Sequence, residues 1–535
     1  MKIKFKLFLL LFAFSFLIYT FFQFPGFQGY EDETYNRIVN NLATGEFKTS
    51  RSGYAQTLLE TPFVFKGQVV DKIFGNNHGR AAQLYALFYN PFVTAVSVAV
   101  IFLIFSLYAS EKKSFLLSLL YAFGTMAFPY ASIGMEPTAV LLVLLSVYFL
   151  FKFGECGNMA CHVPANVYLL AAGFFYFGLS FSKAYYFVTI PAYIAYLYLL
   201  CGRALNLKLS RITNFIKYCS YFFAPLIIIL PAYLLANKYN FGVYFGGQYK
   251  LSDELFGGEN ILFGVYGLLL GFGKSIFIYV PALILSIILF PKFYGKKPKE
   301  AVFVLAYSAL LILFVSQIHW WSDETWGPRY LLSLSAVGLL PLVALKKEDF
   351  ISVVAPVKAG IQKKVISWIP DQIGNDKKRI GIGNLVISLI LAFSFLFQLL
   401  GALVRYDVFP YTFYEIYEKT GYNVLASQEY QYIPQFAPYR VNYQVLKNKI
   451  LGRDDFIKYK IIYTPPMEMA SQKREGGIIK EIVYDNTKYK NHALNFWWMN
   501  VPEIAAYKLL GIFVLIFAGL IWWGKGLLIF SLNHR

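Results

Sequence analysis

Apolar runs recur along the whole chain, and about twelve of them are long enough to cross a bilayer of roughly 30 Å. A backbone in lipid has to satisfy its own hydrogen bonds, so runs of this length fold as helices. We therefore predict an all-α polytopic membrane protein with about twelve transmembrane helices. They are expected near residues 5–24, 83–108, 114–131, 136–153, 167–182, 184–200, 217–236, 273–290, 301–317, 330–345, 383–403 and 503–524.

The composition agrees with a lipid environment. Of the 535 residues, 57% are hydrophobic and only 15% are charged, which lies outside the balance of soluble domains. A net charge of +19 would ordinarily suggest nucleic-acid binding, but the Lys and Arg residues fall largely in short loops between apolar runs. We expect the bilayer, and no nucleic acid, as a partner.

The distribution of basic residues predicts which loops lie inside. Short connections that follow the second, fourth, sixth, eighth and tenth predicted spans are rich in Lys and Arg, as cytoplasmic loops are. We expect a multi-pass protein of the cell membrane with both termini in the cytoplasm. The main outer connections are then residues 25–82, 237–272, 318–329 and 404–502.

Three regions follow from this topology. Residues 1–403 form a transmembrane domain, in which we expect interfacial helices in the first outer loop, 25–82. Residues 404–502 form a small extracytoplasmic segment whose Tyr- and Ile-rich runs between Gly, Pro and Asn residues suggest some β-structure. Residues 503–535 provide the last transmembrane helix and a cytoplasmic tail.

The cysteines give little reason to expect a metal or a disulfide. All four lie in or beside loops predicted to be cytoplasmic, where thiols normally stay reduced. Cys156, Cys161 and His162 are three candidate metal ligands without a fourth at usable spacing. We predict no metal site, no cofactor and no structural disulfide.

Acidic residues cluster at the outer face. Glu31, Asp32 and Glu33 follow the first span, and Glu136 opens the fourth. Acids in the first turn of a helix also complement its dipole, so helix capping is the structural alternative at both places. A carboxylate at the membrane surface can instead act as a general base.

Cationic and aromatic residues accompany these acids on the same face. Lys183 falls inside an apolar region of some thirty residues, where an ionisable group is costly and usually functional. His319, Arg329 and Tyr330 belong to a loop with three tryptophans at the outer mouth of the tenth span. An interfacial aromatic belt is the alternative there. Acids, cations and rings on one face suit an active site for a lipid phosphate.

Four short motifs resemble the glycosyltransferase C superfamily, in particular protein O-mannosyltransferases and lipid A aminoarabinose transferases. They are the acidic stretch from Glu31 to Tyr35 with its continuation to Gly45, the acid Glu136, the turn from Gly178 to Lys183, and Gly-Pro-Arg-Tyr at 327–330. The segment 271–281 is also similar to one that precedes the last motif in many members. Together these matches cover roughly residues 1–345.

The resemblance implies an inverting membrane glycosyltransferase that uses a polyprenyl-phosphate sugar, with residues 1–403 as its catalytic domain. Related enzymes use Asp as the base, which favours Asp32, whereas alignment without gaps on Tyr35 and Gly45 selects Glu31. Glu33 and Glu136 would support the base. Lys183, His319, Arg329 and Tyr330 would bind the donor.

The acceptor, a glycan, lipid or protein, stays open. The alternative function is a transporter or flippase of lipid-linked saccharides, which would place its polar groups near the bilayer midplane rather than at the outer interface.

Overall fold

The computed structural model describes most of the chain. The described residues are 2–28, 31–50, 53–75, 79–134, 136–156, 163–201, 208–244, 261–318, 325–345, 375–420, 434, 437–452, 457–459, 482–484, 492–500, 512–516 and 518–520. These residues are helical apart from one short sheet, so the prediction of an α-helical architecture is confirmed.

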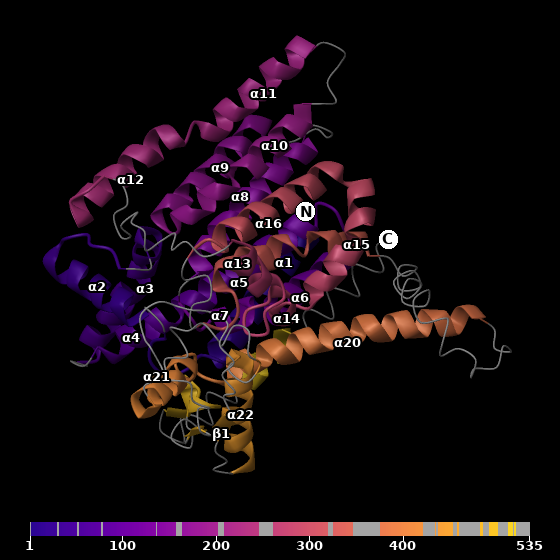
Figure 1. Ribbon diagram of the computed structural model, residues 1–535. Helices are drawn as coiled ribbons and strands as arrows, with labels where there is room; N and C mark the ends of the chain where they lie inside the picture. The colour runs from indigo at the N-terminus through magenta and orange to yellow at the C-terminus, as the bar shows by residue number, and fades with distance from the viewer. Residues whose placement is uncertain are drawn as a thin grey trace, which may run out of the picture.

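A bundle of apolar helices makes up the body of the protein (Figure 1). Within it α1 packs on α5, α5 on α6 and α8, α8 on α9, and α10 on α16. α11 and α12 run along its outside against α9. The helices are α1 (Lys2–Phe21), α5 (Tyr89–Phe105), α6 (Glu111–Gly124), α8 (Pro137–Cys156), α9 (Ala165–Gly178), α10 (Ile190–Leu200), α11 (Lys208–Phe223), α12 (Leu226–Phe241), α15 (Ala282–Lys296) and α16 (Pro298–Val315).

Five helical segments among the described residues are long and apolar enough to cross a membrane: 3–21, 80–105, 137–156, 211–241 and 298–315. Five shorter apolar helical segments also occur among the described residues. Four of them, at 165–181, 184–200, 329–344 and 387–403, coincide largely with further predicted spans, whereas 261–270 lies in a predicted outer connection. The total of twelve spans stays a prediction, and most of 503–524 lies outside the described residues.

Breaks near one end of the bundle shorten several of these helices. α6 ends at Gly124 and is followed by the single turn α7 (Ala127–Tyr130). α9 ends at Gly178, and two 3₁₀ segments, η1 (Leu179–Phe181) and η2 (Ala184–Thr189), lead into α10. Two short helices, α13 (Ile261–Leu269) and α14 (Ile276–Tyr279), likewise precede α15 in place of one continuous helix. The broken turns release backbone groups that must find other partners, which is typical of functional regions in membrane proteins.

The segment between α1 and α5 folds into three helices that cover this end of the bundle: α2 (Glu31–Thr44), α3 (Tyr54–Ile73) and α4 (Arg80–Leu87). Asp71 of α3 accepts hydrogen bonds from the backbone N–H groups of Ala81 and Ala82, at 3.0 and 2.9 Å. A carboxylate on the first N–H groups of a helix satisfies donors that have no partner within the helix. Asp71 thereby fixes α4 against α3.

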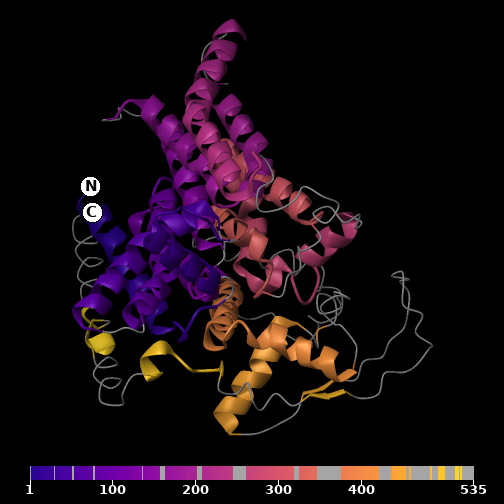
Figure 2. The ribbon, with the colours of Figure 1, turned by 90° about the vertical axis from the view of Figure 1, so that its left-hand side faces the viewer.

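The described helices and strands between residues 401 and 500 lie at the same end of the bundle (Figure 2). α20 (Asn375–Leu403) crosses the bundle against α6 and α7, and α21 (Val408–Thr420) and α22 (Pro438–Leu451) follow. β1 (Ile457–Tyr459) pairs antiparallel with β2 (Ile482–Tyr484) in the segment for which β-structure was predicted. Three short 3₁₀ segments complete the set: η4 (Arg329–Leu331), which leads into α17 (Leu332–Val337), η5 (Leu340–Ala344) and η10 (Trp497–Asn500).

Tyrosines are the largest fully buried side chains of the bundle, and several use their hydroxyls to join helices. The Tyr19 hydroxyl donates to the Ala122 carbonyl at 2.9 Å, and the Tyr307 and Ser333 hydroxyls share a hydrogen bond at 2.7 Å. A buried hydroxyl needs such a partner because no water is available in the core of the bundle.

Candidate active site

The first turn of α2 separates the three consecutive acids. Glu31 is buried, with 3% of its surface exposed, whereas Asp32 is exposed and Glu33 is half-buried. Successive residues on a helix point about 100° apart, so one residue of such a triplet faces the protein. The Asp32 carboxylate accepts a hydrogen bond from the Glu33 N–H at 2.8 Å. Asp32, the base preferred from the sequence, thus lies at the surface, and Glu31 lies inside.

The Glu31 carboxyl joins α2 to the helix bundle. One oxygen accepts a hydrogen bond from the backbone N–H of Gln28 at 2.8 Å, and the other accepts from the side-chain amide of Asn90 on α5. Gly134 lies against this pair, because a Cβ atom there would come within 2.3 Å of the Glu31 Cγ atom. Burial raises the pKa of Glu31 to about 8, although the two hydrogen bonds oppose the rise.

A second buried acid, Glu60 on α3, lies near Glu31 and was not identified from the sequence. Its carboxylate accepts a hydrogen bond from the Gln56 amide at 3.3 Å. Burial raises the pKa of Glu60 well above its usual value, and the Glu31 charge raises it further. A sequence pattern could have revealed this acid. The polar residues Gln56, Thr57 and Glu60 lie on one face of α3, and the opposite face exposes Leu58, Phe65 and Ile73. In this helix the polar face is the buried one.

Glu136 and Lys183 form an ion pair on the neighbouring side of the site. Glu136 is fully buried at the start of α8, and its carboxylate lies 3.8 Å from the Lys183 ammonium. The Tyr185 hydroxyl donates to the same carboxylate at 3.2 Å. Lys183 sits in the non-helical turn between η1 and η2, where its backbone is extended. The break after Gly178 therefore brings this cation to Glu136.

Arg329 and Tyr330 extend this cluster. The Arg329 guanidinium donates to the Tyr330 hydroxyl at 2.7 Å, and the Tyr330 ring packs edge-on against Tyr185 with 5.6 Å between ring centroids. Both residues are nearly buried, at 8% exposure each. Four residues predicted to form one site, Glu136, Lys183, Arg329 and Tyr330, are thus brought together. His319 lies outside the described residues.

A buried cation holds the loop that carries Arg329. The Lys274 ammonium donates to the carbonyls of Thr325 and Gly327, at 2.6 and 3.0 Å. Lys274 belongs to segment 271–281, which the sequence singled out without a role for this residue. Gly327 has a positive φ of 66°, and a Cβ there would come within 2.7 Å of the Tyr279 ring. Only glycine fits this turn.

The last third of the chain contacts the connection that leads to Glu31. The Tyr406 N–H donates to the Gln28 side chain at 3.0 Å, and the Arg405 guanidinium donates to the Phe27 carbonyl at 3.2 Å. The positive charge of Arg405 lowers the pKa of Glu31, against the larger effect of burial. Arg405 also pairs with Asp407 at 3.1 Å. The segment 404–407 therefore belongs to the site.

Two tryptophans of η10 hold the end of α1 in place through hydrogen bonds to its backbone carbonyls. The Trp497 indole donates to the Thr20 carbonyl at 2.7 Å, and the Trp498 indole donates to the Phe21 carbonyl at 3.0 Å. The Trp497 backbone N–H donates to the Gln23 carbonyl at 2.9 Å. These bonds satisfy carbonyls that are left open where the helix stops.

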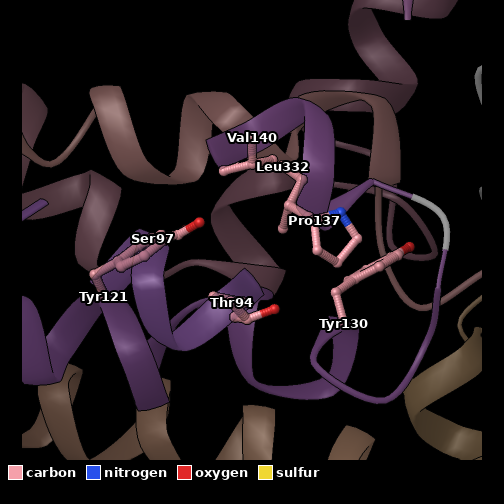
Figure 3. A pocket seen from close by; sticks show the side chains of 8 residues that line it. Thr94, Ser97, Tyr121, Tyr130, Pro137, Val140 and Leu332 are labelled. Atoms are coloured by element: carbon pink, nitrogen blue, oxygen red, sulfur yellow. The ribbon is translucent and has the colours of Figure 1, made fainter. Parts of the chain in front are cut away.

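A very small cavity of about 10 Å³ lies beneath the start of α8 (Figure 3). Thr94, Ser97 and Tyr121 line it on one side, and Pro137, which follows Glu136, lines it on another. The Thr94 hydroxyl is buried and has no hydrogen-bond partner among the described residues. The helix start that presents Glu136 is therefore closely packed apart from this very small cavity, whose lining is largely apolar.

The sequence led us to expect neither a metal site nor a structural disulfide. No group of three or more His, Cys, Asp or Glu side chains that could hold a metal ion occurs within the described residues, and Cys161 and His162 lie outside them. Cys201 and Cys219 are free thiols. Cys156 is disulfide-bonded, so the expectation of no disulfide was wrong there. It rested on the compartment alone, which does not decide whether two thiols lie within bonding distance.

Comparison with solved structures gives a distant likeness. No protein-family model and no curated protein matches the chain. The apo-form crystal structure of the oligosaccharyltransferase from Archaeoglobus fulgidus is similar, with a TM-score of 0.49 and 11% sequence identity. The match covers 82% of this chain and 60% of the archaeal protein. A likeness of this degree assigns neither a family nor an activity to the chain.

The raised pKa of Glu31 predicts a specific pH dependence of stability. Unfolded Glu31 loses its proton near pH 4.5 and folded Glu31 near pH 8, so the folded state loses stability as pH rises between these values. Glu31→Gln cannot ionise and escapes this loss. We expect equal unfolding temperatures of variant and wild type at about pH 4, and a more stable variant at about pH 9.

Thermal unfolding in detergent measures the difference, with Asp32→Asn as the control because Asp32 is the exposed neighbour. A variant that is destabilised equally at both pH values would show that folding does not raise the pKa of Glu31.

Proposed function

We propose that this chain is a membrane glycosyltransferase of the glycosyltransferase C type, which transfers a sugar from a polyprenyl-phosphate donor to an acceptor hydroxyl on the extracytoplasmic side. The observation that carries the proposal is the joint placement of a buried carboxyl, Glu31, and a cationic cluster, Lys183 and Arg329, at one end of an apolar helix bundle. Transfer from a lipid phosphate needs a base for the acceptor and cations for the leaving group.

Gly134 and Glu136 link the two halves of this site. Gly134 packs on the Glu31 carboxyl, and Glu136, two residues later, pairs with Lys183. The acid and the cations therefore belong to a continuous set of contacts. Both halves lie beside the ends of apolar helices, whereas a transporter would place such groups midway along its helices.

Glu31 is the better candidate for the base. Its burial beside Glu60 raises its pKa to about 8, so it holds a proton more strongly than an ordinary carboxylate. A base whose pKa lies near the working pH transfers protons efficiently in both directions. Asp32 is exposed and caps the first turn of α2. This arrangement agrees with the alignment without gaps, which selects Glu31.

The reaction proceeds by a single displacement. The acceptor oxygen attacks the anomeric carbon opposite the phosphate while its proton passes to Glu31. The bond between that carbon and the phosphate oxygen breaks, and polyprenyl phosphate leaves with the electron pair. Arg329 and Lys183 stabilise the charge that develops on the leaving phosphate. Attack from the opposite face inverts the anomeric configuration.

Substitution of the acids tests the assignment of the base. Glu31→Gln keeps the shape of the side chain and removes its basicity, so we expect turnover to fall by about 10²- to 10⁴-fold with little change in donor binding. Asp32→Asn is the matched control and should stay within a few-fold of wild type. Radiolabelled donor consumption and donor binding are measured on the same folded preparations. A loss of turnover in Asp32→Asn alone would instead identify Asp32 as the base.

Substitution of Arg329 tests the site for the phosphate. A guanidinium binds two phosphate oxygens at once, which the single ammonium of lysine cannot do. We expect Arg329→Lys to impair turnover and Arg329→Ala to weaken donor binding as well. Arg80→Lys is the control, because it makes the same change of side chain at the start of α4. Normal donor affinity and rate in Arg329→Ala would rule out this role.

A further inference from the structure

Three consecutive backbone carbonyls in the loop before Arg329, those of residues 325–327, accept hydrogen bonds from buried side chains of other segments. The Lys274 ammonium supplies the first and third bonds, at 2.6 and 3.0 Å, and the Tyr130 hydroxyl of α7 supplies the second at 3.1 Å. The Arg329 N–H then donates to the Gly327 carbonyl at 3.1 Å. The backbone from which the Arg329 side chain leaves is therefore fixed over several residues.

The side chain of Trp326, the middle residue of this loop, is held by α20. Its indole N–H donates to the Gln398 side-chain carbonyl at 3.1 Å, and the Gln398 amide donates in turn to the Tyr279 carbonyl at the end of α14. Trp326 is 4% exposed, and Gln398 is fully buried. Polar groups that are removed from water need partners of this kind. Gln398 therefore joins α14 and α20 to the loop that carries Arg329.

Gly401, about one helical turn after Gln398, lets the Trp326 indole lie directly on α20. A Cβ atom at residue 401 would come within 2.5 Å of the indole Cε2 atom and 2.8 Å of its Nε1 atom. The Tyr279 ring meets the indole edge-on, and the Phe397 ring packs beside it, with centroids at 5.2 and 5.5 Å. A side chain at residue 401 would thus displace an indole that its neighbours confine.

The same end of α20 also contacts the half of the site that holds Glu31. The helix ends at Leu403, and soon afterwards the Tyr406 N–H donates to the Gln28 side chain at 3.0 Å. The Gln28 N–H donates in turn to the Glu31 carboxyl at 2.8 Å. Groups that act together in one reaction need a fixed relative position. A single stretch, 398–406, bonds both to the Arg329 loop and to the connection that leads to Glu31.

We propose that Gln398 and Trp326 are positioning residues, which hold Arg329 at the separation from Glu31 that transfer requires. They act through the backbone of residues 326–329 and leave contact with the donor phosphate to Arg329. The inference rests on the proposed function, in which Arg329 stabilises the leaving phosphate. A displacement of about 1 Å can cost about 10²-fold in rate, so a loosened loop should slow transfer more than it weakens donor binding.

Two variants of α20 in the full-length protein test this proposal. Gln398→Met keeps the length of the side chain and removes both hydrogen bonds, whereas Gly401→Ala displaces the indole and leaves the bonding groups in place. We expect turnover of the polyprenyl-phosphate sugar that wild type consumes to fall by about 10²-fold in each, with donor affinity within a few-fold. Turnover is measured per folded molecule, and the unfolding temperature is recorded for each variant.

Gly295→Ala is the matched control, because it adds the same methyl group to a helical glycine of α15 where nothing lies within 4 Å. We expect its turnover to equal that of wild type. Gly401→Ala decides the matter where Gln398→Met does not yield folded protein. A lower unfolding temperature with normal turnover per folded molecule in the α20 variants would show a purely structural role and overturn the inference.

Combination with Arg329→Ala separates this inference from the proposed function. If Gln398 acts only through Arg329, Gln398→Met should slow an Arg329→Ala enzyme little further, since the two losses are not additive. Losses that multiply in the double variant would overturn the positioning role while the role of Arg329 stands. Normal turnover in Arg329→Ala alone would instead contradict the proposed function, and this inference with it.

Discussion

The hydrogen bond between Glu31 and Asn90 is the contact on which the site depends most. It joins α2, which covers one end of the bundle, to α5, which is nearly fully buried in the bundle. A carboxyl that is removed from water must be protonated, paired or hydrogen-bonded, and here Asn90 and the Gln28 N–H supply the bonds. The adjacent glycine, Gly134, leaves room for this arrangement. Other contacts of the site place further groups around this carboxyl.

The contacts from the last third of the chain have the same physical basis. Where α1 ends, its carbonyls need donors, and the indoles of Trp497 and Trp498 provide them. Arg405 and Tyr406 then bond the connection at residues 27–28. The described parts of residues 404–500 therefore belong to the scaffold of Glu31, and their loss would release the acid as well as the end of α1.

Much of this site could be predicted from the sequence. The apolar runs predicted the helices, and the grouping of Glu136, Lys183, Arg329 and Tyr330 followed from their shared place at helix ends. The choice between Glu31 and Asp32 could not be made, because the two differ by only about 100° around one helix. Glu60 was missed because α3 buries its polar face, the reverse of a helix in a soluble protein. The contacts of Arg405 span more than 370 residues of sequence, and no local pattern predicts them.

The most direct measurement of the central claim is the fate of a lipid-linked sugar in sealed proteoliposomes that contain the purified protein. A panel of polyprenyl-phosphate sugars is offered together with candidate glycan, lipid and peptide acceptors, and mass spectrometry follows the donor. The account predicts that one donor is converted to polyprenyl phosphate and a glycosylated product of inverted configuration, and that Glu31→Gln abolishes this conversion. Movement of intact donors across the bilayer without conversion of any of them would contradict it and indicate a transporter.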